Sequence, residues 1–318
     1  MDAQTEKPKF AKTVKILDHG YLKYVDHMGS DEAIVEAART STGRGFVSWD
    51  PYERCDVCEA VRFPTSIDVV LEDVAVAAQH PDCQHVWKKF PRGDLGLLEY
   101  LYVHRHLTPL EVGGELCVEA KSPIFVFREW QRHRTFGFNE MSARYTPLPD
   151  LNYVPTVERL MMNSTTNKQA GVAAGADELS AVGASVYRQS LVKMYEQQEA
   201  LYQEALKMGV PKELARCHLP VGRYSRMRAK TDLRNWLAFL ELRQADTAQW
   251  EIRQFADGVA GIVQEIWPRT FALYEEHARH GVRIGQTEAM VLRETLDLLA
   301  PMSAPKTMPR LHAALRKF

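Results

Sequence analysis

Helical patterns limit how this chain can fold more than any other feature of its sequence. The clearest covers Val186–Lys207, where apolar residues recur with the period of an α-helix, followed by Gly209 as a helix-ending residue and Pro211 beyond it. Strand patterns are few and do not alternate with the helices as they would in βαβ units. The sequence therefore predicts an α+β fold, a helix-rich single domain with a small sheet.

Shorter elements are predicted from local start and stop signals. A turn over Asp18–Gly20 is typical of a hairpin between two strands. Residues suited to capping precede three predicted helices, namely Ser30, Ser122 (with Pro123 at the first helical position) and Asp246 in a capping box. The predicted strands are Val14–Leu17, Tyr21–Val25 and Glu115–Ala120, and the predicted helices end near Arg39, cover Leu95–Tyr102, Ile124–Arg134 and about Leu233–Leu242, and end at Trp267.

Three parts follow one another along the chain. Residues 1–12 are predicted to be a disordered lead-in, residues 13–280 the domain, and residues 281–318 a C-terminal tail. Within the domain, residues 42–93 contain scattered glycine, proline, cysteine and histidine, and are predicted to form an irregular insertion. Asn163–Gly175 is polar and rich in small residues, which favours a mobile loop.

The insertion contains a cysteine and histidine pattern with two interpretations. Cys55 and Cys58 form a C-x-x-C pair, and His80, Cys83 and His85 follow. Such a set is compatible with a zinc site. The spacing is not that of a standard zinc finger, however, and the later residues equally suit an ordinary loop. The prediction for this chain therefore assigns no metal.

Composition and charge exclude several classes of partner. The 318 residues carry a net charge of −1, so nothing attracts the whole chain to nucleic acid or to an acidic membrane. No apolar run approaches the length of a membrane span. Five cysteines in a chain of this length fit a reducing compartment, and the predicted location is cytoplasmic. Any anionic ligand must therefore be held by a local cluster of cations.

One such cluster lies between Gln131 and Tyr145. It begins with Arg132, His133 and Arg134, and Gly137 follows. The next polar groups are an amide, a carboxylate, a hydroxyl and a guanidinium, from Asn139, Glu140, Ser142 and Arg144. This mixture suits a ligand with both a phosphate and a heterocycle edge. The alternative, a solvated cationic helix end, complements the helix dipole but does not explain the polar loop that follows.

A second basic region comes later in the chain. Its members are Lys212, Arg216, Arg223, Arg226, Arg228, Lys230 and Arg234. The simplest alternative is a basic surface, for example for RNA. However, Arg216, Arg234 and also Arg243 border apolar runs, and an arginine beside packed surface usually needs an anionic partner. Both regions together therefore favour a nucleotide site.

Arg132-His133-Arg134, followed after seven residues by Ser142, resembles the RHR-X7-S signature of the flavin-dependent thymidylate synthases. Other segments resemble motifs of that family in the same order, namely Arg105–Glu111, Pro123–Val126, Ala215–Pro220, Leu242-Arg243 and Ala248–Glu251. No G-x-G-x-x-G motif follows a predicted strand, so the flavin is not expected to bind as in a Rossmann fold. By the resemblance of these motifs, the chain is identified as a member of this family.

The resemblance implies a reaction, cofactors and an assembly. The reaction is reductive C5-methylation of a uracil nucleoside 5′-monophosphate, either dUMP to dTMP or UMP to 5-methyl-UMP as in nucleoside-antibiotic pathways. The cofactor is FAD, with methylenetetrahydrofolate as one-carbon donor and NADPH as reductant. The assembly is a homotetramer whose active sites form from several subunits. A non-catalytic homologue that binds flavin and nucleotide is the alternative.

The resemblance also implies site residues at matching positions. Those expected to contact the flavin are Thr108, Arg132, His133, Arg134, Glu140, Asp232 and Arg234. Those expected to line the nucleotide site are Glu129, Arg132, Glu140, Ser142, Ala143, Arg144, Arg216 and Arg243. Arg243 is the expected catalytic residue, stabilising negative charge that develops at N3 and O2 of the uracil. Ser142 has no evident base partner, so we expect it to bind the nucleotide rather than attack it.

Four positions depart from the residues common in the family, namely Glu129, Asp232, Ala238 and Thr247. They leave open whether the sugar of the substrate is ribose or deoxyribose. If Glu129, where many relatives have glutamine, accepts a hydrogen bond from a ribose 2′-hydroxyl, UMP is preferred. Alternatively, Glu129 pairs with Arg128 or Arg132 at the helix end and does not affect sugar preference.

Overall fold

The computed structural model describes residues 13–63, 79–163, 178–282 and 284–299. The predicted lead-in over residues 1–12 lies outside the described residues, as do the predicted loop after Asn163 and the end of the predicted tail. Two compact units follow one another along the chain, Met1–Tyr274 and Glu275–Phe318. In the described part of the chain, no helix is long and apolar enough to cross a membrane.

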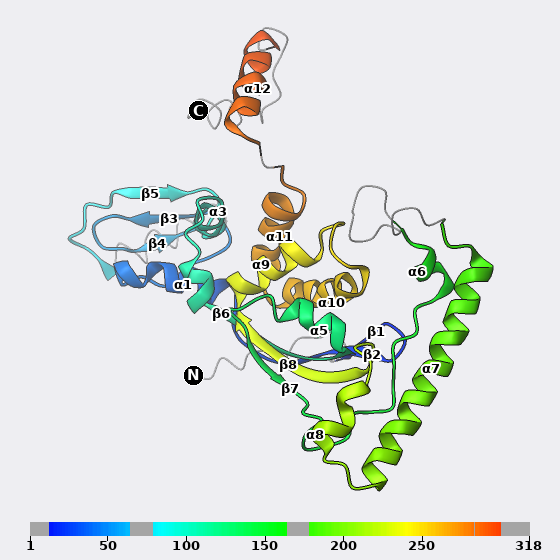
Figure 1. Ribbon diagram of the computed structural model, residues 1–318. Helices are drawn as coiled ribbons and strands as arrows, with labels where there is room; N and C mark the ends of the chain where they lie inside the picture. Colours follow the sequence, from blue (N-terminus) through cyan, green and yellow to red (C-terminus); the bar gives the residue numbers. More distant parts are fainter. Residues whose placement is uncertain (1–12, 64–78, 164–177, 283, 300–318) are drawn as a thin grey trace. The chain divides into compact units, whose positions relative to one another are not determined.

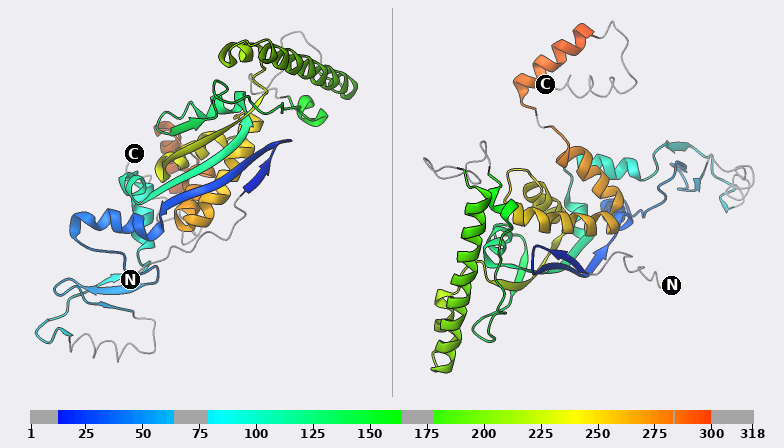
Figure 2. Two further views of the ribbon diagram at one scale, coloured as in Figure 1. Left: turned by 90° about the horizontal axis from the view of Figure 1, so that it is seen from below. Right: turned by 90° about the vertical axis from the view of Figure 1, so that its right-hand side faces the viewer.

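Five antiparallel strands form the main sheet in the order β1-β2-β6-β8-β7 (Figures 1 and 2). They are β1 (Thr13–Ile16), β2 (Gly20–Gly29), β6 (Gly114–Pro123), β7 (Gly137–Glu140) and β8 (Tyr224–Asp232). Buried side chains alternate with more exposed ones along β6 and β8, so the core lies on one face of the sheet. The predicted hairpin is confirmed, and the strand predicted at Glu115–Ala120 is confirmed within the longer β6.

Three helices pack on one face of this sheet, namely α5 (Ile124–Trp130), α9 (Leu233–Arg243) and α10 (Trp250–Ile266) (Figure 1). Aromatic rings fill the space between them. The ring centroid of Trp130 lies 5.9 Å from that of Trp236 and 4.8 Å from that of Phe239. Such buried rings dominate the packing energy of a core. This core therefore fixes the C-terminal end of α5 relative to α9.

The other described helices are α1 (Asp31–Arg39), α3 (Leu95–Val103), α4 (Thr108–Val112), α6 (Val157–Met161), α7 (Ala181–Lys207), α8 (Lys212–Ala215), α11 (Pro268–Tyr274) and α12 (Gln286–Leu299). Short helical turns occur at Thr40–Thr42 (η1), Arg216–His218 (η2) and Glu275–Arg279 (η3). Ser30 caps α1 as predicted, by accepting a hydrogen bond from Ala33 N at 3.3 Å. Gly209 follows α7 with a left-handed φ of 83°, as its predicted role requires.

The helix predicted at Ile124–Arg134 is shorter than expected. α5 ends at Trp130, and the basic residues that follow lie in a turn. Ser122 does not cap this helix, because it is the penultimate residue of β6 and lies opposite Ser225 of β8. A residue before proline favours extended backbone, and here the sheet pairing uses that conformation.

The capping box predicted at Asp246 is also wrong. α10 begins at Trp250, and Gln249 before it makes no side-chain capping hydrogen bond. Asp246 instead pairs with Arg253, with its carboxylate Oδ1 3.4 Å from the guanidinium. The residues just before α10 form a turn rather than the first turn of that helix, because Ala248 N donates to Ala245 O.

The insertion at residues 42–93 contains a second sheet, so the prediction of irregular structure is wrong for its described part. Its antiparallel strands are β3 (Tyr52–Cys55), β4 (Val61–Arg62) and β5 (Trp87–Phe90), in the order β4-β3-β5. Strands this short show no periodic pattern in the sequence. Buried Asp94 joins this sheet to α1, because it accepts hydrogen bonds from Tyr52 Oη at 2.8 Å and Arg39 Nη1 at 3.0 Å.

Candidate active site

Residues Arg132, His133 and Arg134 form a tight turn between α5 and β7. Before them, Gln131 N donates to a carbonyl of α5, and His133 N donates to Trp130 O, both at 2.9 Å. After them, β7 pairs with β8 along its whole length. The turn is therefore held at both ends, and its three basic side chains start from a fixed backbone.

Arg243, the predicted catalytic residue, contacts two other predicted site residues. Its Nη1 donates to Glu129 Oε2 at 2.5 Å, and its Nη2 donates to Glu129 O at 2.9 Å. Its Nε donates to His133 Nε2 at 3.0 Å. These hydrogen bonds fix the guanidinium, which is only 15% exposed. Glu129 pairs with Arg243 in the described structure, so the expected alternatives Arg128 and Arg132 are wrong.

His133 accepts the hydrogen bond from Arg243 Nε as a neutral imidazole. Burial, and then the nearby Arg243 cation, lower the pKa of His133 to about 4. Because Nε2 accepts the hydrogen bond, the proton of the neutral ring lies on Nδ1. The ring packs against Phe136 and Phe239, with centroids 5.8 Å and 4.9 Å away. His133 therefore holds Arg243 without repelling it at neutral pH.

This arrangement predicts a pH dependence of stability. The pKa of His133 is about 4 in the folded protein, whereas its ordinary value, which applies to the unfolded chain, is 6.5. As the pH falls, His133 is therefore protonated in the unfolded chain before it is protonated in the folded protein. The stabilising contribution of His133 is thus complete above about pH 6.5 and decreases toward about pH 4. The difference in free energy of unfolding between the wild type and His133→Gln should shrink over this window. Urea unfolding at several pH values measures it, and a constant difference contradicts the assignment.

The end of β7 and the loop after it carry three further predicted residues. Glu140 ends β7 and accepts a hydrogen bond from Gln131 Nε2 at 3.4 Å, and burial raises the pKa of Glu140. Ser142 Oγ accepts a hydrogen bond from Arg144 N at 3.3 Å. Ser142 has no base partner among the described residues, which supports a binding role rather than a nucleophilic one. The side chain of Ala143 is buried.

The neighbouring predicted cations Arg132 and Arg134 have no anionic partner in the described part of the chain. Arg132 and Arg134 are exposed and form no ion pair there. By contrast, Arg234 pairs with Glu111 of α4, and Arg144 pairs with Glu213 at 3.3 Å. Neighbouring cations without a partner suit an anionic ligand.

The remaining predicted residues lie on other elements. Thr108 is the exposed first residue of α4. Asp232 caps α9, where its Oδ1 accepts from Asn235 N at 2.9 Å and its Oδ2 from Asn235 Nδ2 at 2.6 Å. Arg216 opens η2 and has no ion pair within the described ranges. The structure thus brings Glu129, His133 and Arg243 together, whereas no described hydrogen bond joins Thr108, Arg216 or Asp232 to them.

The second basic region is partly neutralised in the folded chain. On β8, Arg228 pairs with Glu119 at 3.3 Å and Lys230 pairs with Glu115 at 2.8 Å, both from the neighbouring β6. Arg223 is buried and pairs with an acidic residue of α7. The region therefore does not form the continuous basic surface that the RNA alternative requires.

Two cavities of the structure are lined by residues outside the predicted site. One, of about 340 Å³, borders the buried Glu251, which accepts hydrogen bonds from Tyr153 Oη at 3.0 Å and Arg159 Nε at 2.7 Å. The sequence matched Glu251 to a family motif without assigning it a role, and the structure makes it a buried ion-pair partner. The other, of about 700 Å³, lies beside α1, α3 and the second sheet. None of the predicted site residues lines either cavity.

Comparisons with known proteins show the family to which the chain belongs. The family described as "Thymidylate synthase complementing protein" matches residues 23–269. The flavin-dependent thymidylate synthase of Thermus thermophilus is 35% identical over 299 residues, covering 94% of this chain and 90% of that protein. The one from Anaplasma marginale is 33% identical over 285 residues, covering 89% and 81%. The chain belongs to the flavin-dependent thymidylate synthase family and is an enzyme of that family.

Solved structures confirm the fold. The UMP/dUMP methylase PolB from Streptomyces cacaoi, bound with 5-Br UMP, matches with a TM-score of 0.61 at 25% identity, covering 85% of this chain and 99% of that chain. The same methylase bound with 5-Br dUMP matches with a TM-score of 0.59 at 25% identity. The predicted α+β fold and the resemblance carried by the RHR segment are therefore both confirmed.

Proposed function

We propose that this enzyme methylates C5 of a uracil nucleoside 5′-monophosphate reductively, with FAD as cofactor and with methylenetetrahydrofolate and NADPH as co-substrates. The observation that carries the proposal is the fixed guanidinium of Arg243, held by Glu129 and His133 beside the segment that matches the family signature. The named activities of the relatives support it, since they are thymidylate synthases and a UMP/dUMP methylase.

Arg243 would act on the uracil through the N–H groups that its present partners leave free. A guanidinium has five N–H donors, and Glu129 and His133 engage three of them. The remaining donors stabilise negative charge as it develops at N3 and O2 of the base. Because His133 stays neutral, it orients the guanidinium of Arg243, and the positive charge of Arg243 remains available to the base.

Arg132 and Arg134 fit the pyrophosphate of FAD, since they are exposed cations without an anionic partner in the described part of the chain. The other residues proposed to hold the flavin are Thr108, His133, Glu140, Asp232 and Arg234. Asp232 would do so by capping α9, which positions Arg234 in the first turn of that helix. Bound FAD would supply the reducing equivalents that convert the transferred one-carbon unit into a methyl group.

The nucleotide would bind next to Arg243. Arg144 and Arg216 suit its phosphate, because the ion pair of Arg144 with Glu213 is more than half exposed on both sides and is easily exchanged. The other residues proposed to line this site are Glu129, Arg132, Glu140, Ser142 and Ala143. These residues come from several elements. By the family resemblance, we propose a homotetramer in which several subunits complete each site.

An activity assay with the purified enzyme tests the reaction. FAD, NADPH and methylenetetrahydrofolate are supplied with dUMP or UMP in separate experiments, and mass spectrometry detects the 5-methylated nucleotide. A flavin-coloured protein that methylates at least one of the two substrates is expected. A protein that binds nucleotide and flavin but methylates neither substrate would instead be the non-catalytic homologue.

Glu129 is proposed to position Arg243 rather than to read the sugar. Glu129→Ala should lower kcat roughly tenfold, because about 1.5 kcal/mol of hydrogen bonding to a charged group is lost. Glu129→Gln should retain most of the activity, since its amide oxygen still accepts from Arg243 Nη1. Both variants should keep the wild-type ratio of kcat/KM for UMP and dUMP. A shift toward dUMP in Glu129→Gln would instead assign the carboxylate to a 2′-hydroxyl.

A further inference from the structure

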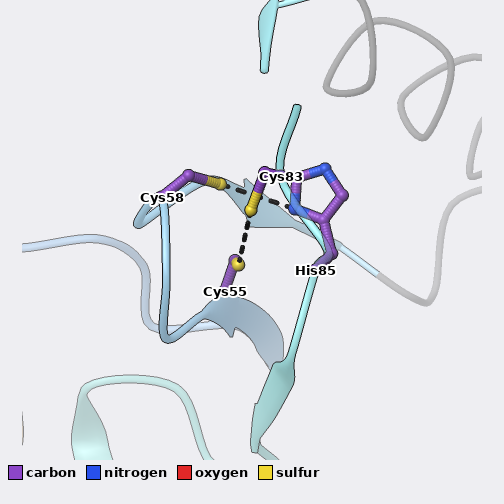
Figure 3. Close-up of side chains that lie close together, drawn as sticks. All are labelled: Cys55, Cys58, Cys83 and His85. Carbon is purple, nitrogen blue, oxygen red and sulfur yellow. Dashed lines mark hydrogen bonds between the residues drawn. The ribbon is translucent and has the colours of Figure 1, made fainter. Parts of the chain in front are cut away.

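We propose that Cys55, Cys58, Cys83 and His85 bind one structural zinc ion that stabilises the insertion. Their ligand atoms all lie within 4.8 Å of one another. Figure 3 shows the three sulfur atoms and the imidazole gathered at one place between the segments that carry them. This inference does not depend on the proposed reaction, and it replaces the sequence prediction, which assigned no metal.

The distances between the ligand atoms fit a tetrahedral zinc site. With Zn–S bonds of about 2.3 Å and Zn–N bonds of about 2.0 Å, tetrahedral geometry places two sulfurs about 3.8 Å apart and a sulfur and a nitrogen about 3.5 Å apart. In the structure, Cys55 Sγ and Cys83 Sγ are 3.7 Å apart, and Cys58 Sγ and His85 Nδ1 are 3.4 Å apart. Four protein ligands fill the coordination shell, which is typical of a structural zinc site rather than a catalytic one.

The turn between β3 and β4 presents the first two ligands. Cys55 ends β3, and Cys58 lies in the turn, where Glu59 adopts a left-handed φ of 62°. The backbone N–H of Val57 donates to Cys55 Sγ at 3.4 Å. Hydrogen bonds of this kind orient a metal ligand, and this one stabilises negative charge on the sulfur.

The segment before β5 presents the other two ligands. Cys83 and His85 lie next to the turn because Asp56 N donates to Val86 O at 2.9 Å. The ring of His85 stacks on Trp87, with centroids 5.1 Å apart and planes inclined by 22°. The position of the imidazole is therefore determined by contacts that do not require the metal.

A disulfide explains the cluster less well than zinc. The Sγ atoms of Cys55 and Cys83 are 3.7 Å apart, whereas a disulfide bond is about 2.05 Å long. A disulfide would also leave one thiol and His85 without a function in the cluster. Thiolate and imidazole ligands together favour zinc over magnesium or calcium, which prefer oxygen.

The second sheet is small, and a bound zinc ion would stabilise it. Its strands have four, two and four residues, too few to build an apolar core. A zinc ion would cross-link the β3–β4 turn to the segment before β5, joining Cys55 to a residue 28 positions later. Small folds commonly use metal binding in this way to supply folding free energy.

Metal analysis of the purified full-length enzyme tests the proposal. We expect about one zinc ion per chain by inductively coupled plasma mass spectrometry. Cys58→Ser and His85→Ala should each lose most of the zinc, whereas the matched control Cys217→Ser, at an exposed cysteine outside the insertion, should retain it. The proposal is overturned by iron in place of zinc, by a disulfide between these cysteines in peptide mass spectra, or by full zinc content in Cys58→Ser and His85→Ala.

A second measurement uses only the wild-type chain and so does not depend on how the variants fold. Removing zinc with a strong chelator should expose residues 42–93 to limited proteolysis, and adding zinc back should restore the protection. Cobalt added in place of zinc should give thiolate-to-cobalt charge transfer in the near ultraviolet and the visible d–d bands of a tetrahedral site. Unchanged cleavage after complete zinc removal would overturn the structural role.

Discussion

Arg243→Lys should lower turnover by roughly a hundredfold or more, because removing one donor to a developing negative charge typically costs that much. Lysine keeps the positive charge, so the uracil nucleotide should still bind. A single ammonium group, however, cannot contact Glu129, His133 and the base together, as a planar guanidinium can. The measurements are kcat for dUMP and UMP and the nucleotide Kd by calorimetry.

Arg253→Lys is the matched control, because the side chain of Arg253 is also mostly buried and its partner Asp246 is fully exposed. It should leave both kcat and Kd close to the wild-type values. If Arg243→Lys keeps wild-type turnover, Arg243 is not the activating group. If it loses nucleotide affinity and keeps kcat, Arg243 only binds the substrate.

The double variant Arg132→Ala/Arg134→Ala should bind FAD roughly a hundredfold more weakly, or worse. Each arginine is proposed to make a charge-assisted hydrogen bond to the pyrophosphate, and such bonds contribute about 1.5–3 kcal/mol each. The fold should be unaffected, because both side chains are exposed and have no ion-pair partner in the described residues. Titration of FAD fluorescence measures the affinity, and circular dichroism checks the fold.

Arg228→Ala is the control for this double variant. Its guanidinium is also exposed and basic, but it pairs with Glu119 on the main sheet and is not among the proposed flavin contacts. It should bind FAD with wild-type affinity. Full flavin retention in the double variant would contradict the assignment of the signature arginines to the flavin.

Local sequence signals determined several elements of this fold correctly. The β1–β2 hairpin, the Ser30 cap and the glycine after α7 each depend on a few neighbouring residues, so a single sequence contains all the information they need. The same holds for the family motifs around Arg132 and Ser142. Their residue types and spacing were enough to predict the family that the comparisons then showed.

Charge pairing across the main sheet was not visible in the sequence. The region around Arg228 has few acidic residues nearby in the chain, yet Glu119, which is 109 positions away, lies opposite it on the neighbouring strand. Strand register, rather than sequence separation, decides which charges meet. Only the folded sheet could show that this region is partly neutralised.

The partner of Glu129 and the gathering of the insertion's cysteines also required the tertiary structure. Arg243 is 114 positions from Glu129, and packing of α5 against α9 brings the two together. Cys83 lies 28 positions after Cys55, and the pairing of β3 with β5 brings the two together. Both strands are too short to show a pattern in the sequence. The sequence by itself determined which chemical groups this protein has and which family it belongs to. The tertiary structure decided which of those groups meet, because contact distances depend on packing and strand pairing rather than on position along the chain.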